Sequence, residues 1–213
     1  MSNPRWNGGQ DLPTRSPRSF EKDSKAAEML PSIAQLFRER GAESFSLAEI
    51  AGELGTSSRM LIYHFGSRDE LLGRVLNIVR RETIAILSDP PPDQVGEAIQ
   101  RWWDYYSARE HLADMQLFFH LASRSFEEPE SFTDFTSTAV VGWADFFARA
   151  IEGEGVEAEA ADSLARLAIA AMRGIMVDYL ITADLESAER SVEAFRELMM
   201  LQTVGGQQRQ SSR

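Results

Sequence analysis

The chain has 213 residues, of which 43% are hydrophobic and 26% are charged, a composition typical of a globular protein and not of a disordered, collagen-like or disulfide-rich one. It contains no cysteine, which excludes thiolate nucleophiles, disulfides, iron–sulfur clusters and cysteine-ligated zinc. The net charge of −11 is unevenly spread: residues 1–81 carry 12 Lys+Arg against 10 Asp+Glu (+2), the remainder carries 10 against 23 (−13), and this division suggests two functions in one chain.

Residues 1–20 contain three Pro, two Gly and three Arg with almost no apolar periodicity, and we predict that they form a flexible basic arm. They lack the apolar segment of a secretory signal. No apolar stretch elsewhere approaches 18 residues, because Arg166, Arg173 and Asp178 interrupt the longest candidate at residues 164–180. We therefore expect a cytoplasmic protein that does not enter a membrane.

A helical period marks the first predicted element, which ends at Gly41 after two arginines. Pro31 lies inside this pattern, so it predicts either a kink or the true start of the helix. The apolar residues that share one face of this helix are Ala26, Leu30, Ile33, Ala34 and Phe37.

Two Ser-x-x-Glu sequences have the form of a capping box and mark the next helix starts. Ser46–Glu49 opens a short helix that ends near Gly55, and Ser67–Glu70 opens a longer one to about residue 88, with a further short helix at residues 56–65 between them. Strand alternation is absent, so we predict an all-α fold of about nine helices. After the break at Pro90–Pro92, helices are predicted at residues 93–108, 110–125, 130–152, 157–183 and 185–202.

The two short helices around Gly55 have the features of a helix-turn-helix. Ala51 is small enough to let the helices cross closely, Gly55 makes the turn, and polar residues open the second helix where side chains reach base edges. Many helical hairpins share this pattern. The sequence that follows, Leu61-Ile-Tyr-His-Phe-Gly-Ser-Arg-Asp-Glu-Leu-Leu72, is more specific.

Over about 45 residues the chain resembles the tetracycline-repressor (TetR) family of transcriptional regulators. The resemblance rests on Ile33-Ala-Gln-Leu-Phe-Arg-Glu-Arg-Gly41, on Phe45-Ser-Leu-Ala-Glu-Ile-Ala51 and on Gly55 through Leu72. It implies an N-terminal three-helix helix-turn-helix module followed by a helical domain for ligand binding and dimerisation. The domains we expect are the arm at 1–20, the DNA-binding domain at 21–66, the ligand-binding and dimerisation domain at 67–204 and a disordered tail at 205–213.

The resemblance also implies DNA contacts. Ser46 would cap its helix and touch a phosphate, and Arg59 would make a bidentate contact with guanine. Ile62 stands where the family usually has the Tyr of its Leu-Tyr-x-x-Phe motif, so that phosphate contact would pass imperfectly to Tyr63. The expected groove-facing residues are Ser57, Ser58, Arg59 and Met60, and the expected phosphate contacts are Ser46, Tyr63, His64 and Arg68.

The two C-terminal helices carry more apolar surface than one protomer can cover. The helix at 157–183 has an unbroken apolar stripe from Leu164 to Leu180 with a second row beside it, and the helix at 185–202 has a 3-4-3-4 apolar spacing. We predict a homodimer through a four-helix interface of these two helices. The residues expected near it are Tyr179, Val192, Phe195 and Met199.

Aromatic residues gather in the helices predicted over residues 93–152. Trp102-Trp-x-Tyr-Tyr106 places aromatic rings on both faces of one helix, and the family resemblance implies an inducer cavity here, with core packing as the alternative for each residue. Asp104 and Asp114 border the aromatics and no cationic residue lies among those at 110–125. We therefore predict a small, largely apolar effector that is neutral or cationic. The candidate ligand contacts are Trp103, Tyr106, Gln116, Phe119, His120, Trp143 and Phe147.

Other classes of function lack support in the sequence. The three histidines, His64, His111 and His120, have no metal-ligand spacing, and no G-x-S-x-G, P-loop or G-x-G-x-x-G sequence occurs. We predict no catalytic residue, no metal and no cofactor. The predicted function is a ligand-responsive repressor that binds a double-stranded, pseudo-palindromic DNA operator as a dimer. The alternative is a helical protein–protein interaction protein that has lost DNA binding, which Ile62 and the acidic balance favour.

Overall fold

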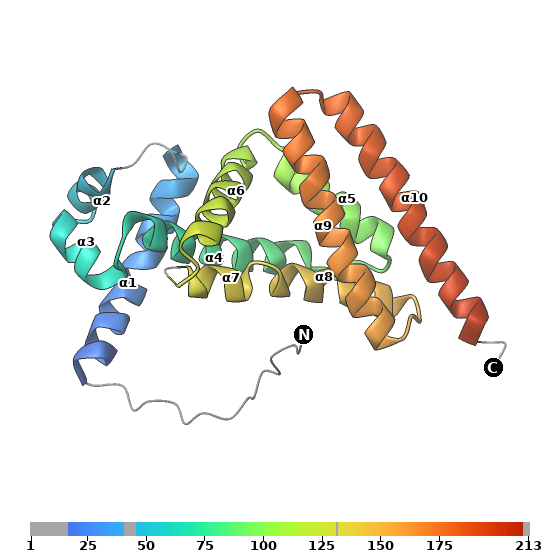
Figure 1. Ribbon diagram of the computed structural model, residues 1–213, viewed down its shortest axis with the longest axis horizontal. Helices are drawn as coiled ribbons and strands as arrows, with labels where there is room; N and C mark the ends of the chain where they lie inside the picture. The colour runs from blue at the N-terminus through green and yellow to red at the C-terminus, as the bar shows by residue number, and fades with distance from the viewer. Residues whose placement is uncertain (1–16, 41–45, 131, 211–213) are drawn as a thin grey trace, which may run out of the picture.

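A computed structural model describes residues 17–40, 46–130 and 132–210, and every regular element within them is a helix (Figure 1). The all-α prediction is confirmed. The ten helices of the described residues are α1 (Pro17–Arg40), α2 (Leu47–Glu53), α3 (Ser58–Phe65), α4 (Arg68–Leu87), α5 (Val95–Ser107), α6 (Leu112–Glu127), α7 (Thr133–Thr138), α8 (Val141–Gly153), α9 (Ala158–Thr182) and α10 (Leu185–Gln210).

Helices α1, α2 and α3 form a small module at one end of the molecule (Figure 1). Its core contains Ile33, Ile50, Leu61 and Phe65, each 1% exposed or less. Helix α1 continues through Pro31, so this proline is not the start of the helix. Most of the arm predicted at residues 1–20 lies outside the described residues, and its last four residues belong to α1.

Helix α4 joins this module to the rest of the chain and contributes to both hydrophobic cores. Its first half buries Leu72 and Val75 in the core of the module, and its last turns pack Ile84 and Leu87 against the second core. The first core continues onto α6 and α7, where Phe135 is 3% exposed. The fold therefore has no gap at residues 66–67, where the sequence predicted a domain boundary.

The helix predicted at residues 130–152 is two helices, α7 and α8. Phe135 of α7 packs in the first core, whereas Trp143 and Phe147 of α8 pack in the second. Because the apolar residues on either side of Ala139 serve different cores, one straight helix could not bury both sets.

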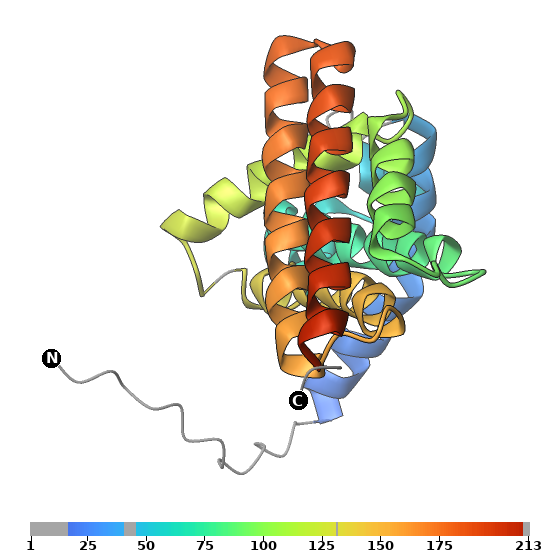
Figure 2. The same ribbon diagram turned by 90° about the vertical axis from the view of Figure 1, so that its right-hand side faces the viewer.

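Helices α9 and α10 run side by side along one flank of the molecule (Figure 2). They are joined by a tight connection in which Ala183 takes a left-handed conformation with φ of 56°. Helix α10 continues to Gln210, so most of the predicted disordered tail at 205–213 is helical, and its last three residues lie outside the described part.

The inward faces of α9 and α10 correct the predicted dimer residues. Val192 and Met199 are each 2% exposed within the protomer, because they pack with Met172 and Met176 in the second core. Tyr179 and Phe195 are half-buried against that core. A different set of apolar or small residues is exposed on the outer side of the two helices: Leu167, Ala170, Gly174 and Ile181 on α9, and Ala194, Leu198 and Leu201 on α10.

Candidate nucleic-acid interface and ligand cavity

The turn between α2 and α3 depends on two small residues. Gly55 has a φ of +63°, in the left-handed region where residues with a side chain are strained. The Thr56 amide donates to the Ala51 carbonyl at 2.9 Å, which closes the end of α2. Ala51 is 3% exposed and lets α3 lie close to α2. This is the helix-turn-helix geometry that the sequence predicted.

Serine side chains fix the starts of α2, α3 and α4. The Ser46 hydroxyl accepts from the Glu49 amide at 3.3 Å and the Ser46 amide donates to Glu49 Oε2 at 2.7 Å, a complete capping box. Hydrogen bonds from the Ser46 hydroxyl and amide also hold the pKa of Glu49 below its ordinary value. The Ser57 hydroxyl accepts from the Met60 amide at 3.3 Å, and Ser67 caps α4 in the same way.

Helix α3 buries one face and presents the other. Leu61 and Phe65 are 1% exposed or less and hold the helix on the module. Met60 and Tyr63 are 41% and 53% exposed, so their side chains are available to a partner. The groove-facing residues predicted from the family, together with Ile62 and Tyr63, share this accessible face: Ser57, Arg59, Met60, Ile62 and Tyr63 are exposed, and Ser58 is half-buried.

His64 does not belong to this face. It is 5% exposed, because it follows Leu61 by three residues and therefore lies on the buried side of the helix. Its ring packs edge-on against Tyr63 at a centroid distance of 5.1 Å. This buried position does not support the predicted contact between His64 and a phosphate. The ring instead packs against the exposed Tyr63.

Arg68 opens α4, where the positive end of the helix dipole also favours a phosphate. Its side chain is 36% exposed and its Nη1 lies 3.9 Å from Asp69 Oδ1. Asp69 in turn faces α6, with Arg124 Nε at 3.4 Å and His120 Nε2 at 4.0 Å. The start of α4 therefore meets both the accessible face of the module and the second half of the chain.

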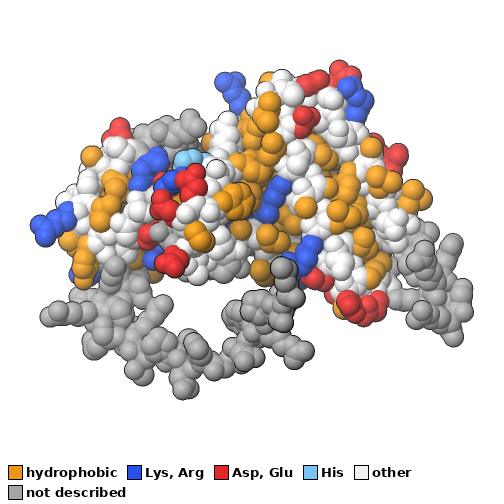
Figure 3. Space-filling model, in the orientation of Figure 1, with side chains coloured by type: hydrophobic (Ala, Val, Ile, Leu, Met, Phe, Trp, Pro, Cys, Tyr) orange, Lys and Arg blue, Asp and Glu red, His pale blue; other side chains and the backbone are white. Residues whose placement is uncertain are grey.

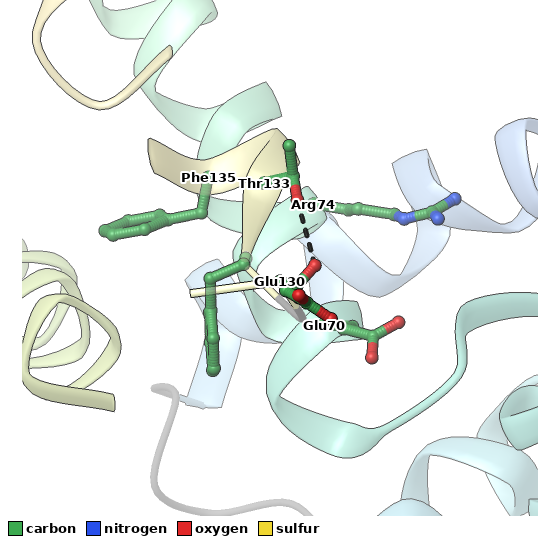
Figure 4. Close-up of a pocket in the computed structure, with 7 residues that line it drawn as sticks. Glu70, Arg74, Glu130, Thr133 and Phe135 are labelled. Atoms are coloured by element: carbon green, nitrogen blue, oxygen red, sulfur yellow. Dashed lines mark hydrogen bonds between the residues drawn. The ribbon is translucent and has the colours of Figure 1, made fainter. Parts of the chain in front are cut away.

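One hollow lies between α4 and α7, near the module (Figure 4). The Thr133 hydroxyl donates to the Glu130 carbonyl at 2.8 Å along its wall. Figure 4 shows the labelled side chains of Arg74, Phe135 and Glu70 extending in different directions. The hollow is open to solvent and lacks the convergent polar groups of a specific small-molecule site.

A second, much smaller cavity lies deeper, among α4, α5, α6, α8 and α9, with a free volume of about 20 Å³. Its aromatic rings contact one another: the Trp102 and Tyr106 centroids are 4.7 Å apart, and Trp143 lies 6.2 Å from Trp102 and 5.8 Å from Tyr106. The residues that line it are Leu76, Arg80, Trp102, Tyr106, Asp114, Met115, Phe118, Trp143 and Arg173.

Two of the seven predicted ligand contacts, Tyr106 and Trp143, line this cavity. Trp103 and Phe147 are buried elsewhere in the core, where Trp103 packs against Tyr179 at 5.9 Å. The other three lie on α6 away from the cavity, because α6 turns Met115 and Phe118 inward: Gln116 and His120 are exposed, and Phe119 is half-buried.

The sequence prediction missed two arginines in the cavity wall, Arg80 from α4 and Arg173 from α9. Arg80 is 7% exposed, and burial lowers its pKa. Burial, with the nearby charge of Arg80, lowers the pKa of Arg173 to about 10, which leaves Arg173 cationic at neutral pH. Arg80 is cationic as well, because a guanidinium is not deprotonated in proteins. These charges were not part of the reasoning that led to a neutral or cationic ligand, which stays a prediction. The sequence does contain a signal for these charges. Arg80 follows Val79 and Arg173 follows Met172, so each arginine lies next to apolar residues of its helix.

Comparison with known proteins identifies the N-terminal module. Residues 30–75 match the family described as "Bacterial regulatory proteins, tetR family". The HTH-type transcriptional repressor Rv3405c of Mycobacterium tuberculosis is 31% identical over 81 residues. That match covers 38% of this chain and 43% of the repressor, so it spans less than half the length of the relative.

Solved structures resemble the chain over most of its length. A TetR transcriptional regulator from Legionella pneumophila matches with a TM-score of 0.58 and 20% identity, over 88% of this chain and 98% of that one. The multidrug binding protein EbrR, solved with imidazole, matches with a TM-score of 0.54 and 19% identity, over 87% and 95% of the two chains. At this level of identity the likeness concerns the fold.

The described helices and acidic side chains bear on membranes and metals. Among the described residues, no helix combines the length and apolar character needed to cross a membrane. The same part of the chain holds no cluster of three or more His, Asp or Glu side chains arranged to hold a metal ion.

Proposed function

We propose that the chain is a TetR-family transcriptional regulator with its helix-turn-helix in α2 and α3, and that it is a dimeric repressor whose operator affinity is set by a small molecule bound in the C-terminal helices. The observation that carries the proposal is the accessible face of α3, fixed by the Ser57 cap and backed by a buried helix face. The family is one of non-enzymatic regulators. Such a protein acts where its DNA lies, in the cytoplasm.

The proposed DNA contacts divide into two kinds. Arg59 is exposed in the first turn of α3, where a guanidinium can reach the O6 and N7 acceptors of guanine in the major groove. Arg68 at the start of α4, with Ser46 and Tyr63, would contact phosphates, which position the protein without reading sequence. The strongly acidic remainder of the chain would keep non-specific DNA affinity low.

The outer sides of α9 and α10 support a dimer. Leu167, Ile181, Leu198 and Leu201 are between 55% and 78% exposed, and together they form an apolar face on two long adjacent helices (Figures 2 and 3). Gly174 lies within this face, and a Cβ added there would meet nothing within 4 Å in the protomer. A mid-helix glycine costs about 1 kcal/mol relative to alanine, so close approach of a second copy is a reason for it.

The second cavity supports ligand control. It is lined by aromatic rings with a few polar groups, as small-molecule sites usually are. EbrR, whose fold is similar, is described as a multidrug binding protein. Because α4 contributes both Arg68 at the DNA face and Arg80 at the cavity, a ligand that shifts α4 would change the spacing of the two modules in the dimer.

Selection of bound sequences from random duplex DNA tests the regulator directly. We expect a pseudo-palindromic site with two half-sites about one helical turn apart or a multiple of it. Affinity for that site should fall steeply as salt rises, since each phosphate contact releases counterions. A chain that enriches no duplex sequence would instead support the protein–protein interaction alternative, and the regulator would be refuted.

Sedimentation tests the dimer. The chain has a mass of 23.9 kDa, and we expect twice this mass at micromolar concentration. Leu198→Glu with Leu201→Glu should give a folded monomer, because two carboxylates would lie in the centre of the apolar face. Phe126→Glu is the matched control, since Phe126 is 85% exposed on α6 and away from α9 and α10. A wild-type monomer would contradict this interface.

A further inference from the structure

The second cavity contains buried hydrogen-bond donors that lack acceptors. Arg80 Nε and Nη1 are buried and have no hydrogen-bond partner among the described residues. Trp102, another residue of the wall, holds a third such donor at Nε1. Leaving donors buried and unpaired is costly, and an ionised guanidinium is the costliest of them. A molecule that completes this cavity must therefore bring acceptors.

The charges in the cavity wall favour a ligand of negative charge. Arg80 from α4 and Arg173 from α9 place two guanidinium groups in the wall, and Asp114 is the one carboxylate among the lining residues. Burial keeps the pKa of the Tyr106 phenol above its ordinary value, so this group is neutral and does not offset the arginines. The wall therefore has a net charge of one positive unit, which one anionic group would neutralise.

Arg173 is held in position by groups that leave it cationic. Its Nη2 donates to the Ala139 carbonyl at 2.5 Å, and its Cζ lies 4.2 Å from the centroid of the Phe118 ring. Arg173 is thus held by Phe118 of α6 and by Ala139, which follows α7, whereas Arg80 Nε and Nη1 have no acceptor among the described residues. A planar anion can accept from a guanidinium through two oxygens at once, which a spherical ion cannot do.

The remaining wall is apolar and suits a flat body. Trp102, Tyr106 and Trp143 supply ring faces and edges, and Leu76 and Met115 supply aliphatic surface. The free volume between these side chains, about 20 Å³, is close to that of one water molecule, so part of the wall must move before a small ligand can enter. Met115, an unbranched and flexible side chain that is 4% exposed, is suited to such movement.

We propose that this cavity binds a small organic carboxylate with a flat apolar body, its carboxylate paired with Arg80 and Arg173 and its body among Trp102, Tyr106 and Trp143. The proposal rests on the proposed function, in which a ligand in the C-terminal helices controls DNA binding. It names the chemical class of that ligand. It also makes the carboxylate a bridge between α4, which leads to the DNA-binding module, and α9, which leads to the dimer face.

Matched ligand pairs test the charge requirement on the full chain. Benzoate is compared with benzamide, and indole-3-acetate with indole-3-acetamide, by thermal unfolding and by quenching of tryptophan fluorescence. At least one carboxylate should raise the unfolding midpoint and quench fluorescence, and its amide should bind about 10- to 100-fold more weakly because it lacks the charge-assisted hydrogen bonds. Equal binding of acid and amide, or no stabilisation by either acid, would overturn the proposal, as would inorganic phosphate acting as well as the acids.

Arginine variants test the site itself. Arg80→Met removes a buried charge without changing size greatly, so the ligand-free midpoint should be equal or higher while the carboxylate-induced shift disappears. Arg81→Met is the matched control, because Arg81 is exposed on the next position of α4 and should keep the full shift. A lowered midpoint with the carboxylate shift retained would show that Arg80 is only structural. Should Arg80→Met not fold, Arg173→Met, with Arg166→Met as its exposed control, gives the same comparison on α9.

DNA binding is measured separately from carboxylate binding. If the wild-type chain selects an operator but binds each acid and its amide equally, the proposed carboxylate site is refuted and the proposed regulator is not. Carboxylate-specific stabilisation without any DNA selection would refute the regulator and leave the binding site standing.

Discussion

Two pairs of arginines differ in how far water reaches their charges in the two halves of this protein. Arg59 is exposed on the helix-turn-helix module, and Arg68 at the start of α4 is partly exposed beside Asp69, so water reaches both charges. Arg80 and Arg173 line a cavity among aromatic rings, where burial lowers the pKa of both. The exposed arginines lose little solvation on folding, whereas desolvation of the buried pair costs free energy that the proposed carboxylate would offset.

This difference in solvation predicts different responses to salt and to partners. Contacts between surface arginines and DNA are screened within about 10 Å at 0.1 M salt, so operator affinity should vary strongly with ionic strength. A carboxylate enclosed with Arg80 and Arg173 is shielded from the salt solution, so its affinity should vary little. One titration of salt therefore distinguishes the two sites.

Arg59→Ala should have the largest effect on DNA. We expect a loss of about 1–3 kcal/mol on the best operator and a flattened base preference at one position, because a bidentate contact with guanine is removed. Competition binding with operators mutated at each position measures both quantities. If affinity falls while every base preference is retained, Arg59 contacts phosphate and does not read sequence.

Ser57→Ala should lower the stability of the module by about 1 kcal/mol, since the Met60 amide loses its capping acceptor at the start of α3. Chemical unfolding followed by far-UV circular dichroism gives the free energy. Ser58→Ala, one residue into the helix, is the control and should change stability by less. Equal losses in the two variants would argue against the cap.

Trp143→Phe should weaken ligand binding by about 0.5–1.5 kcal/mol, because one aromatic contact of the cavity is reduced, and should leave ligand-free operator affinity unchanged. Trp103→Phe is the control, since Trp103 is equally buried but does not line the cavity. Ligand titrations by fluorescence and operator titrations measure the two effects. Identical ligand affinities in both variants would place the ligand elsewhere.

Arg68→Ala should have the smallest and most uniform effect. We expect affinity to fall about equally for all duplex sequences and the slope of log K against log salt to decrease by about one, because one phosphate contact is lost. Arg81→Ala, on the exposed side of α4 beyond the module, should leave the slope unchanged. A change in base preference in Arg68→Ala would contradict its role as a phosphate contact.

The fold and the recognition helix could be predicted because their signals are local. Ser46 and Ser67 precede a glutamate by three residues, Gly55 has the freedom that the turn needs, and apolar spacing identifies the long helices. His64 was misplaced because its sequence position between Tyr63 and Phe65 does not state which side of a two-turn helix is buried. That side is set by how α3 packs on α1 and α4.

The cavity could not be predicted because its charges come from residues 93 positions apart. From the sequence alone, Arg173 was only an interruption of an apolar stretch and Arg80 was not singled out, and only the packing of α4 against the later helices brings the two side chains to one cavity. The prediction that Val192 and Met199 lie at the dimer interface was wrong for a related reason. Val192 and Met199 have the spacing of an interface, but the same spacing serves packing against the core of their own protomer.

The position of Arg68 and Arg80 on one helix has a thermodynamic consequence. They are separated by twelve residues, about 18 Å of continuous helix, so a movement of α4 acts on both ends. Linkage is reciprocal: if the carboxylate lowers operator affinity by some factor, the operator lowers carboxylate affinity by the same factor. Regulators on DNA would then be the last to take up ligand. Regulators that are not on DNA would bind ligand first. Operators would lose regulator mainly because regulators that have dissociated and bound ligand do not rebind.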